Sequence, residues 1–254
     1  MVKRIAIIIE SSRVRVPGCE DLPGARKDMF SWIEFLKSDL GGSWDADEEI
    51  KHFHMPELAE ITALLKEHRN DYVFLAFSGH GYEAVDAARG IREKRLCLNN
   101  SELHVPVSRL YPHAFGTGVF DCCRGEVDIS HGSRVINFAL DNLALLKEAQ
   151  SPSVTQRILR KCLFLKMLNS SQRSVVKMFA CGLNQEAHEK SSCGGLYTSL
   201  LIRGAQRWGG ISDGTHLFTT KNAHDFALQT LPTMVSAQVP EYDPPSLSLP
   251  FAVK

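Results

Sequence analysis

The sequence has no excess of charge of either sign, no long apolar run and no paired cysteine motif. Its 29 Lys and Arg residues are balanced by 29 Asp and Glu residues, so the formal net charge is zero. This balance argues against nucleic acid or an anionic membrane as a partner, because both are usually bound by a basic surface. No stretch approaches the roughly 18 apolar residues of a membrane span. The N-terminal run "RIAIII" is too short for a secretory segment.

The seven cysteines form an odd set, and none of them is spaced as Cys-x-x-Cys or placed with histidines as in zinc sites. This pattern does not favour a disulfide framework and leaves at least one thiol free. Free thiols are typical of a reducing compartment. We therefore expect a cytoplasmic protein that needs no metal and no other cofactor.

Apolar runs without polar alternation predict strands that are buried on both faces of a parallel sheet. They lie at residues 4–9, 71–79, 116–123 and 174–182, with a less apolar strand pattern at 49–55. Amphipathic helical patterns lie at residues 22–37, 56–69, 194–208 and 220–235, with Pro56 in the first turn of the second. Residues 80–115 predict a loop and a weak helical stretch. The alternation predicts one α/β domain over residues 1–254, with helices on both faces of the sheet.

Two of the apolar runs end in residues that suit thiol chemistry. One ends in "FSGHGYE", which places His80 between two glycines, and the other ends in "FDCCRGE", which holds Cys122 and Cys123. Sites in open α/β sheets gather at the carboxyl ends of the strands. An imidazole beside a thiol takes the thiol proton, and the thiolate is a strong nucleophile. We therefore expect the N–H groups of Gly81 and of the nucleophilic cysteine to form an oxyanion hole.

These motifs resemble those of the caspase-like cysteine peptidases. "SGHG" is similar to the histidine motif of metacaspases and paracaspases, and "DCCRG" resembles the nucleophile motifs of both metacaspases and caspases. The resemblance implies a caspase-like three-layer α/β/α sandwich with a mostly parallel sheet. It also implies that His80 and Cys123 form a catalytic dyad, with Gly81 and Cys123 as the oxyanion hole. Neighbouring residues of a strand point to opposite faces, so we expect Cys122 to pack behind the nucleophile.

The resemblance also implies which side chain fits the first specificity pocket. Asp121 lies two positions before Cys123, where true caspases carry Gln. In metacaspases and paracaspases an aspartate of the first loop pairs with this residue, and it corresponds to Asp28. Two carboxylates at the base of a slot bind a guanidinium or an ammonium group and repel an aspartate side chain. The resemblance therefore implies an endopeptidase that cleaves protein or peptide substrates after Arg or Lys.

By the same resemblance the domain divides into a large-subunit-like part at 1–130, a variable linker or insertion at 131–174 and a small-subunit-like part at 175–254. The basic residues of the linker are candidate self-cleavage sites: Arg134, Lys147, Arg157, Arg160, Lys161, Lys166 and Arg173. Caspases pair through their last strand, but the proline-rich end of this chain makes a poor pairing edge. A monomer is therefore slightly favoured.

Two other functions stay open at this point. An Asp-specific, caspase-type protease would build its pocket from basic residues of the first loop region, namely Arg13, Arg15 and Arg26. A non-proteolytic scaffold module usually lacks the cysteine or the histidine, and both are present here. Many metacaspases also carry an acidic calcium-binding stretch after the histidine motif. Residues 81–100 offer few acids among more basic residues, which does not favour calcium activation.

Overall fold

The computed structural model describes residues 2–15, 20–86, 91–123, 153–190, 193–212 and 214–254. Their elements are, in chain order, β1 (Arg4–Ser11), α1 (Pro23–Lys37), β2 (Ile50–His54), α2 (Leu58–Glu67), β3 (Tyr72–Gly79), β4 (Gly81–Asp86), β5 (Ile91–Leu96), β6 (Val105–Pro106), α3 (Val107–Leu110), β7 (Gly116–Asp121), α4 (Val154–Ser170), β8 (Val175–Phe179), β9 (Glu189–Lys190), β10 (Gly194–Gly195), α5 (Leu196–Gly209), β11 (Leu217–Thr219), α6 (Thr220–Met234), β12 (Glu241–Asp243) and β13 (Pro250–Val253).

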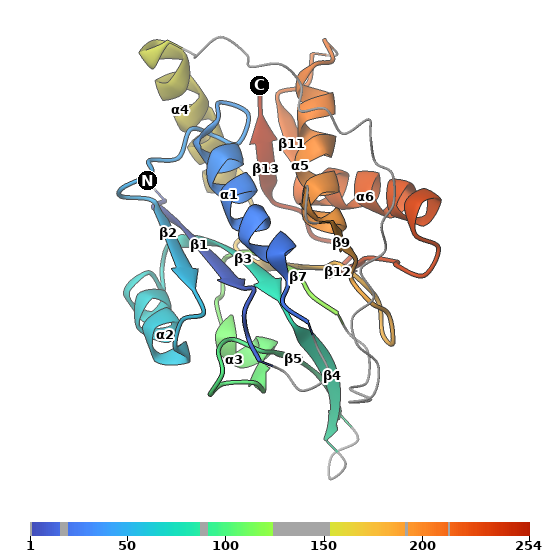
Figure 1. Cartoon of the computed structure of the whole chain (residues 1–254). Coiled ribbons are helices and arrows are strands. Elements are labelled where there is room, and N and C mark those ends of the chain that lie inside the picture. Colours follow the sequence, from blue (N-terminus) through green and yellow to red (C-terminus); the bar gives the residue numbers. More distant parts are fainter. Residues whose placement is uncertain (1, 16–19, 87–90, 124–152, 191–192, 213) are drawn as a thin grey trace.

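The central sheet has six strands in the order β12-β8-β7-β3-β1-β2. All neighbours from β2 to β8 are parallel, and β12 adds an antiparallel edge next to β8. Every residue of β1, β3 and β7 is buried, as expected for apolar strands in the middle of a parallel sheet. Figure 1 shows this sheet between two layers of helices. The predicted α/β sandwich with a mostly parallel sheet is confirmed.

The two faces of the sheet carry separate hydrophobic cores. One core lies beneath α1, α4, α5 and α6 and includes Ile8, Trp32 and Phe251. The other lies beneath α2 and α3 and includes Ile7 and Phe120. Successive residues of a strand alternate between the two cores because their side chains point to opposite faces. This parity decides which side chains at the strand ends share a face.

Residues 80–115 differ from the prediction of a loop and a weak helix. They form a three-stranded antiparallel sheet, β4-β5-β6, followed by the single turn of α3. The charged sequence of β5, "IREKRL", lacks the apolar alternation that indicates a strand, so the sequence did not predict it. The pairing of Gly81 with Leu96 fixes the chain that directly follows His80.

Helix α2 begins later than predicted. Pro56 precedes the helix, Glu57 is the N-cap, and Glu57 and Glu60 form a capping box at its start. Helix α4 contains four of the basic linker residues, namely Arg157, Arg160, Lys161 and Lys166. Arg134, Lys147 and the expected boundary at 130 and 131 lie outside the described residues.

Candidate active site

His80 and Cys123 follow two neighbouring parallel strands, β3 and β7. In their register Ser78 lies opposite Asp121, and each of the two candidate residues stands two positions further along its strand. Extending the strand alternation by these two positions predicts that His80 and Cys123 lie at the same level and on the same face as Ser78 and Asp121. His80 is buried, with 7% of its surface exposed, whereas Cys123 is partly exposed. Cys123 is thus the less enclosed of the two residues.

The two adjacent cysteines point to opposite faces. Cys122 lies in the second core, beneath α2 and α3, and burial raises the pKa of its thiol well above the usual value, with further contributions from the neighbouring thiols. Cys123 is directed to the other side, where its Sγ lies 3.7 Å from the carbonyl oxygen of Ala187. Cys122 thus packs behind the strand as a neutral, inert thiol.

One hydrogen bond holds the imidazole of His80, and another holds its backbone. Nε2 lies 2.9 Å from the carbonyl oxygen of Glu20, which can only accept, so Nε2 carries the proton. The backbone oxygen of His80 accepts the N–H of Cys97 at 3.0 Å. Burial lowers the pKa of His80, against a smaller opposing effect of the Glu20 bond. The ring is therefore neutral near pH 7, with the lone pair on Nδ1.

Gly81, which follows His80, is tightly packed. A Cβ atom at Gly81 would lie 2.8 Å from the Sγ of Cys122 and 3.1 Å from the carbonyl oxygen of Arg95. Only glycine fits without displacing these neighbours. The predicted role of the Gly81 N–H in an oxyanion hole stays a prediction.

Asp28 and Asp121 come from distant parts of the chain and meet inside the protein. Asp28, on α1, accepts the Ser78 hydroxyl at 2.9 Å and the Gly195 N–H at 2.8 Å. Asp121, the last residue of β7, accepts the Thr198 N–H at 3.0 Å. Burial is the main cause that raises the pKa of each aspartate, and for Asp28 the charge of Asp121 adds to it. An acid pair of this kind is stabilised by a cationic partner.

Gly195 separates the two carboxylates. A Cβ atom at this position would lie 2.2 Å from Oδ2 of Asp121 and 2.9 Å from Oδ2 of Asp28. The preceding Gly194 has φ +87°, a left-handed conformation that favours glycine. These two glycines allow the backbone of β10 to approach the acid pair closely.

A third carboxylate, Glu189, was not predicted. Its Oε1 accepts the N–H of Gly24 at 3.1 Å, at the start of the helix that carries Asp28. Burial raises the pKa of Glu189 to about 6, with a smaller contribution from the charge of Asp121. Its surroundings, "NQEAHEK", are polar and have no periodic pattern, so no signal in the sequence marked it.

The alternative pocket of arginines has less support from the described contacts. The guanidinium of Arg26 lies 6.0 Å from the ring of Phe30, an exposed side chain on the outer face of α1. Arg15 is exposed and its backbone N–H binds the side chain of Asn100. Arg13 is also exposed. Asp28 and Asp121, by contrast, are buried and lie together against Gly195.

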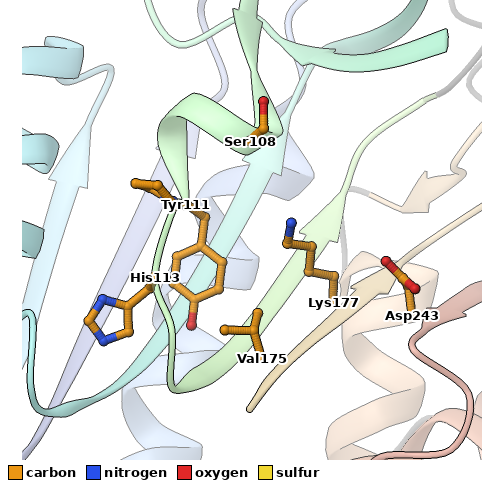
Figure 2. Close-up of a pocket in the computed structure, with 7 residues that line it drawn as sticks. Ser108, Tyr111, His113, Val175, Lys177 and Asp243 are labelled. Carbon is orange, nitrogen blue, oxygen red and sulfur yellow. The ribbon is translucent and has the colours of Figure 1, made fainter. Parts of the chain in front are cut away.

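A cavity of about 340 Å³ lies in another place, and Figure 2 shows side chains that line it. It is lined by Ser108, Tyr111, Pro112, His113, Val175, Lys177 and Asp243. Tyr111 and Val175 lie near the starts of β7 and β8, so this cavity is at the opposite end of these strands from Asp121. It does not belong to the candidate active site.

The described residues were also compared with the requirements of a metal site and of a membrane-spanning helix. Within the described ranges, no cluster of three or more His, Cys, Asp or Glu side chains is arranged to hold a metal ion. Among the helices of the same residues, none has the length and apolarity to cross a membrane. Independence from calcium stays a prediction.

Comparisons with known proteins agree with the fold. A caspase structure, Caspase-1 from Spodoptera frugiperda, aligns with a TM-score of 0.59 and 12% identity over 100% of this chain and 93% of that chain. Protein GSU0716 from Geobacter sulfurreducens aligns with a TM-score of 0.58 and 15% identity over 99% of both chains. Among curated protein sequences, none matches this chain. The caspase domain family, Peptidase_C14, matches residues 3–251. The chain therefore belongs to the caspase domain family and is a caspase-like cysteine peptidase.

Proposed function

We propose that this protein is a cysteine endopeptidase that cleaves proteins after Arg or Lys with a dyad of His80 and Cys123. The observation that carries the proposal is the meeting of two buried carboxylates, Asp28 and Asp121, where β7 ends beside β3. Asp121 lies only two residues before the nucleophile. A side chain bound to this acid pair therefore belongs to the residue next to the scissile bond.

The chemistry follows from the tautomer of His80. Because Nε2 donates to Glu20, Nδ1 accepts the proton of the Cys123 thiol. The thiolate attacks the scissile carbonyl carbon, and the N–H groups of Gly81 and Cys123 stabilise the oxyanion. The imidazolium then protonates the leaving amine, which leaves a thioester. Water, deprotonated by the neutral imidazole, hydrolyses the thioester and restores the thiol.

The acid pair selects the substrate. An arginine guanidinium forms two parallel hydrogen bonds to a carboxylate, and its charge offsets the repulsion between the two aspartates. Glu189 adds a third carboxylate, which accepts the N–H of Gly24 at the start of the helix that carries Asp28. An aspartate side chain would add a further negative charge to this group and is repelled.

The test compares two fluorogenic peptides that differ only in Arg or Asp before the reporter group. We expect hydrolysis of the Arg peptide, its loss in Cys123→Ala, and its retention in Cys122→Ala, which removes the neighbouring thiol. Cys162→Ala serves as a control for an exposed thiol far from the site. Cleavage of the Asp peptide alone would refute the acidic pocket. No hydrolysis of either peptide, with or without calcium, would favour a scaffold protein.

A further inference from the structure

The loop of residues 180–188, between β8 and β9, and the first residue of β9, Glu189, carry two groups of the candidate active site. The Ala187 carbonyl oxygen contacts the thiol of Cys123 at 3.7 Å. Glu189, directly after the loop, binds the N–H of Gly24 through its carboxylate. Glu189 also pairs with Gly195 of β10, so the loop and this pairing together set where the third carboxylate lies relative to Asp28 and Asp121.

One buried side chain, Gln238, binds both ends of this loop. Its Nε2 donates to the carbonyl oxygen of Ala180 at 3.0 Å, and its Oε1 accepts the N–H of His188 at 3.1 Å. Ala180 directly follows β8, and His188 lies between the two groups named above. The Gln238 side chain is completely buried, and both of its polar atoms are used.

A second glutamine links the middle of the loop to the same segment of chain. Oε1 of Gln185 accepts the N–H of Gly182 at 3.0 Å and the N–H of Val239 at 2.8 Å. Residues 238 and 239 lie after α6, about 50 residues along the chain from the loop. The loop is therefore shaped by hydrogen bonds to the C-terminal part of the protein, in addition to those within itself.

We propose that Gln238 is a positioning residue that sets the preference for a cationic substrate side chain by holding Glu189 in the pocket. This inference rests on the proposed function. A primary amide is needed because one bond requires a donor and the other an acceptor. Without it, the buried Ala180 oxygen and the half-buried His188 N–H would lose their partners, and the loop would relax toward water to satisfy them. The half-buried carboxylate of Glu189 moves closer to solvent in the same movement.

The test uses Gln238→Met, which keeps the length of the side chain and removes both hydrogen bonds. The readout is the ratio of kcat/KM for a peptide ending in Arg to that for the same peptide ending in citrulline, the uncharged isostere. This ratio does not depend on the fraction of folded enzyme. We expect it to fall about fivefold to tenfold, as for the loss of one or two net hydrogen bonds. Gln238→Glu, which loses only the donor to Ala180, should lower it in the same direction if the Met variant does not fold.

A double-mutant cycle with Glu189→Gln separates positioning from general damage. Glu189→Gln should itself lower the ratio, and adding Gln238→Met should lower it no further, because the carboxylate that Gln238 positions is already absent. Tyr72→Phe is the control for stability: it removes a buried hydrogen bond of 2.9 Å to Thr117 near the start of β3 and should leave the ratio unchanged.

Two results would overturn the inference while the proposed function stands. One is an unchanged ratio in Gln238→Met, and the other is an equal fall with and without the Glu189 carboxylate. A wild-type enzyme that does not prefer Arg to citrulline would refute the proposed function itself, and the role of Gln238 with it.

Discussion

Replacing Asp121 by Asn should make the protein more stable and much less active on arginine substrates. Asn keeps the shape of the side chain, and its carbonyl oxygen still accepts the Thr198 N–H that now binds the carboxylate at 3.0 Å. What changes is the charge, because one member of a buried acid pair becomes neutral. The two effects have opposite signs, so one substitution tests both parts of the reasoning.

The loss of activity follows from Coulomb's law. A unit charge about 4 Å from a guanidinium contributes about 4 kcal/mol at an effective dielectric constant of about 20, which corresponds to roughly a thousandfold. Since Asp28 remains, we expect kcat/KM for the Arg peptide to fall by about a hundredfold to a thousandfold. The citrulline peptide should be cleaved as by the wild type, because it carries no charge to lose.

The gain in stability depends on pH, and its sign follows from the raised pKa of both aspartates. A carboxyl group whose pKa is higher in the folded state stabilises the fold below its unfolded pKa, and this contribution is lost as the pH rises through the folded pKa. Each unit by which the pKa is raised corresponds to about 1.4 kcal/mol. Asp121→Asn should therefore melt higher than the wild type at pH 8, by about 2–4 °C per kcal/mol, and by less at pH 4.

The measurement is a set of thermal melts between pH 4 and pH 8 together with the two peptide assays. Asp225→Asn is the matched control, because it changes the net charge equally but removes a half-exposed carboxylate paired with Lys221 on α6. A fall of less than about tenfold on the Arg peptide, or a lower melting temperature than the wild type at pH 8, would refute the account of the pocket.

Three further predictions concern the same site. Gly195→Ala should abolish cleavage after Arg, because its methyl group would lie 2.2 Å from Oδ2 of Asp121. Gly210→Ala is the control: its new methyl group would have no neighbour closer than 3.6 Å, and it should have no effect on the peptide assay. Gly81→Ala should lower kcat by roughly tenfold to a hundredfold, since the new Cβ would lie 2.8 Å from the Cys122 sulfur and displace the chain beside the general base; unchanged kcat would contradict this packing. The Arg-to-citrulline ratio should fall as the pH drops through about 6, where the Glu189 carboxylate becomes protonated, and Glu189→Gln should remove this step from the pH profile. The protonation of the general base cancels in that ratio, so a step that persists in the variant would assign it to another group.

The strand ends were predictable from the sequence because their signal is local. Apolar runs that end in Gly-rich motifs placed His80 and Cys123 after buried strands, and strand parity separated Cys122 from Cys123. The structure has these strands side by side, with Ser78 opposite Asp121. Pairing of Asp28 with Asp121 came only from the family resemblance, because 93 residues separate them in the chain and no periodic pattern links them.

Other parts depend on tertiary contacts that leave no local signature. The charged strand β5 is held by its pairing with β4 and by Leu96, which is buried in the second core. Glu189 owes its place to the N–H of Gly24, and Gln238 to two carbonyl and amide groups of a distant loop. Glu189 and Gln238 are polar residues in polar stretches of the sequence. Only the folded structure distinguishes them from polar residues that are exposed to solvent.

The neighbouring strands β7 and β8 have a consequence for a chain that is cut between them. Both strands lie inside the same sheet and are hydrogen-bonded to each other. A cut within residues 124–152 would therefore give two fragments that share this sheet and one hydrophobic core. We expect the two fragments to bind each other and restore the fold. The first fragment would carry His80, Cys123 and the acid pair. The second would carry Glu189 and Gln238. Mixing second fragments from related enzymes with one common first fragment would then exchange substrate preference while leaving the reactive thiol unchanged.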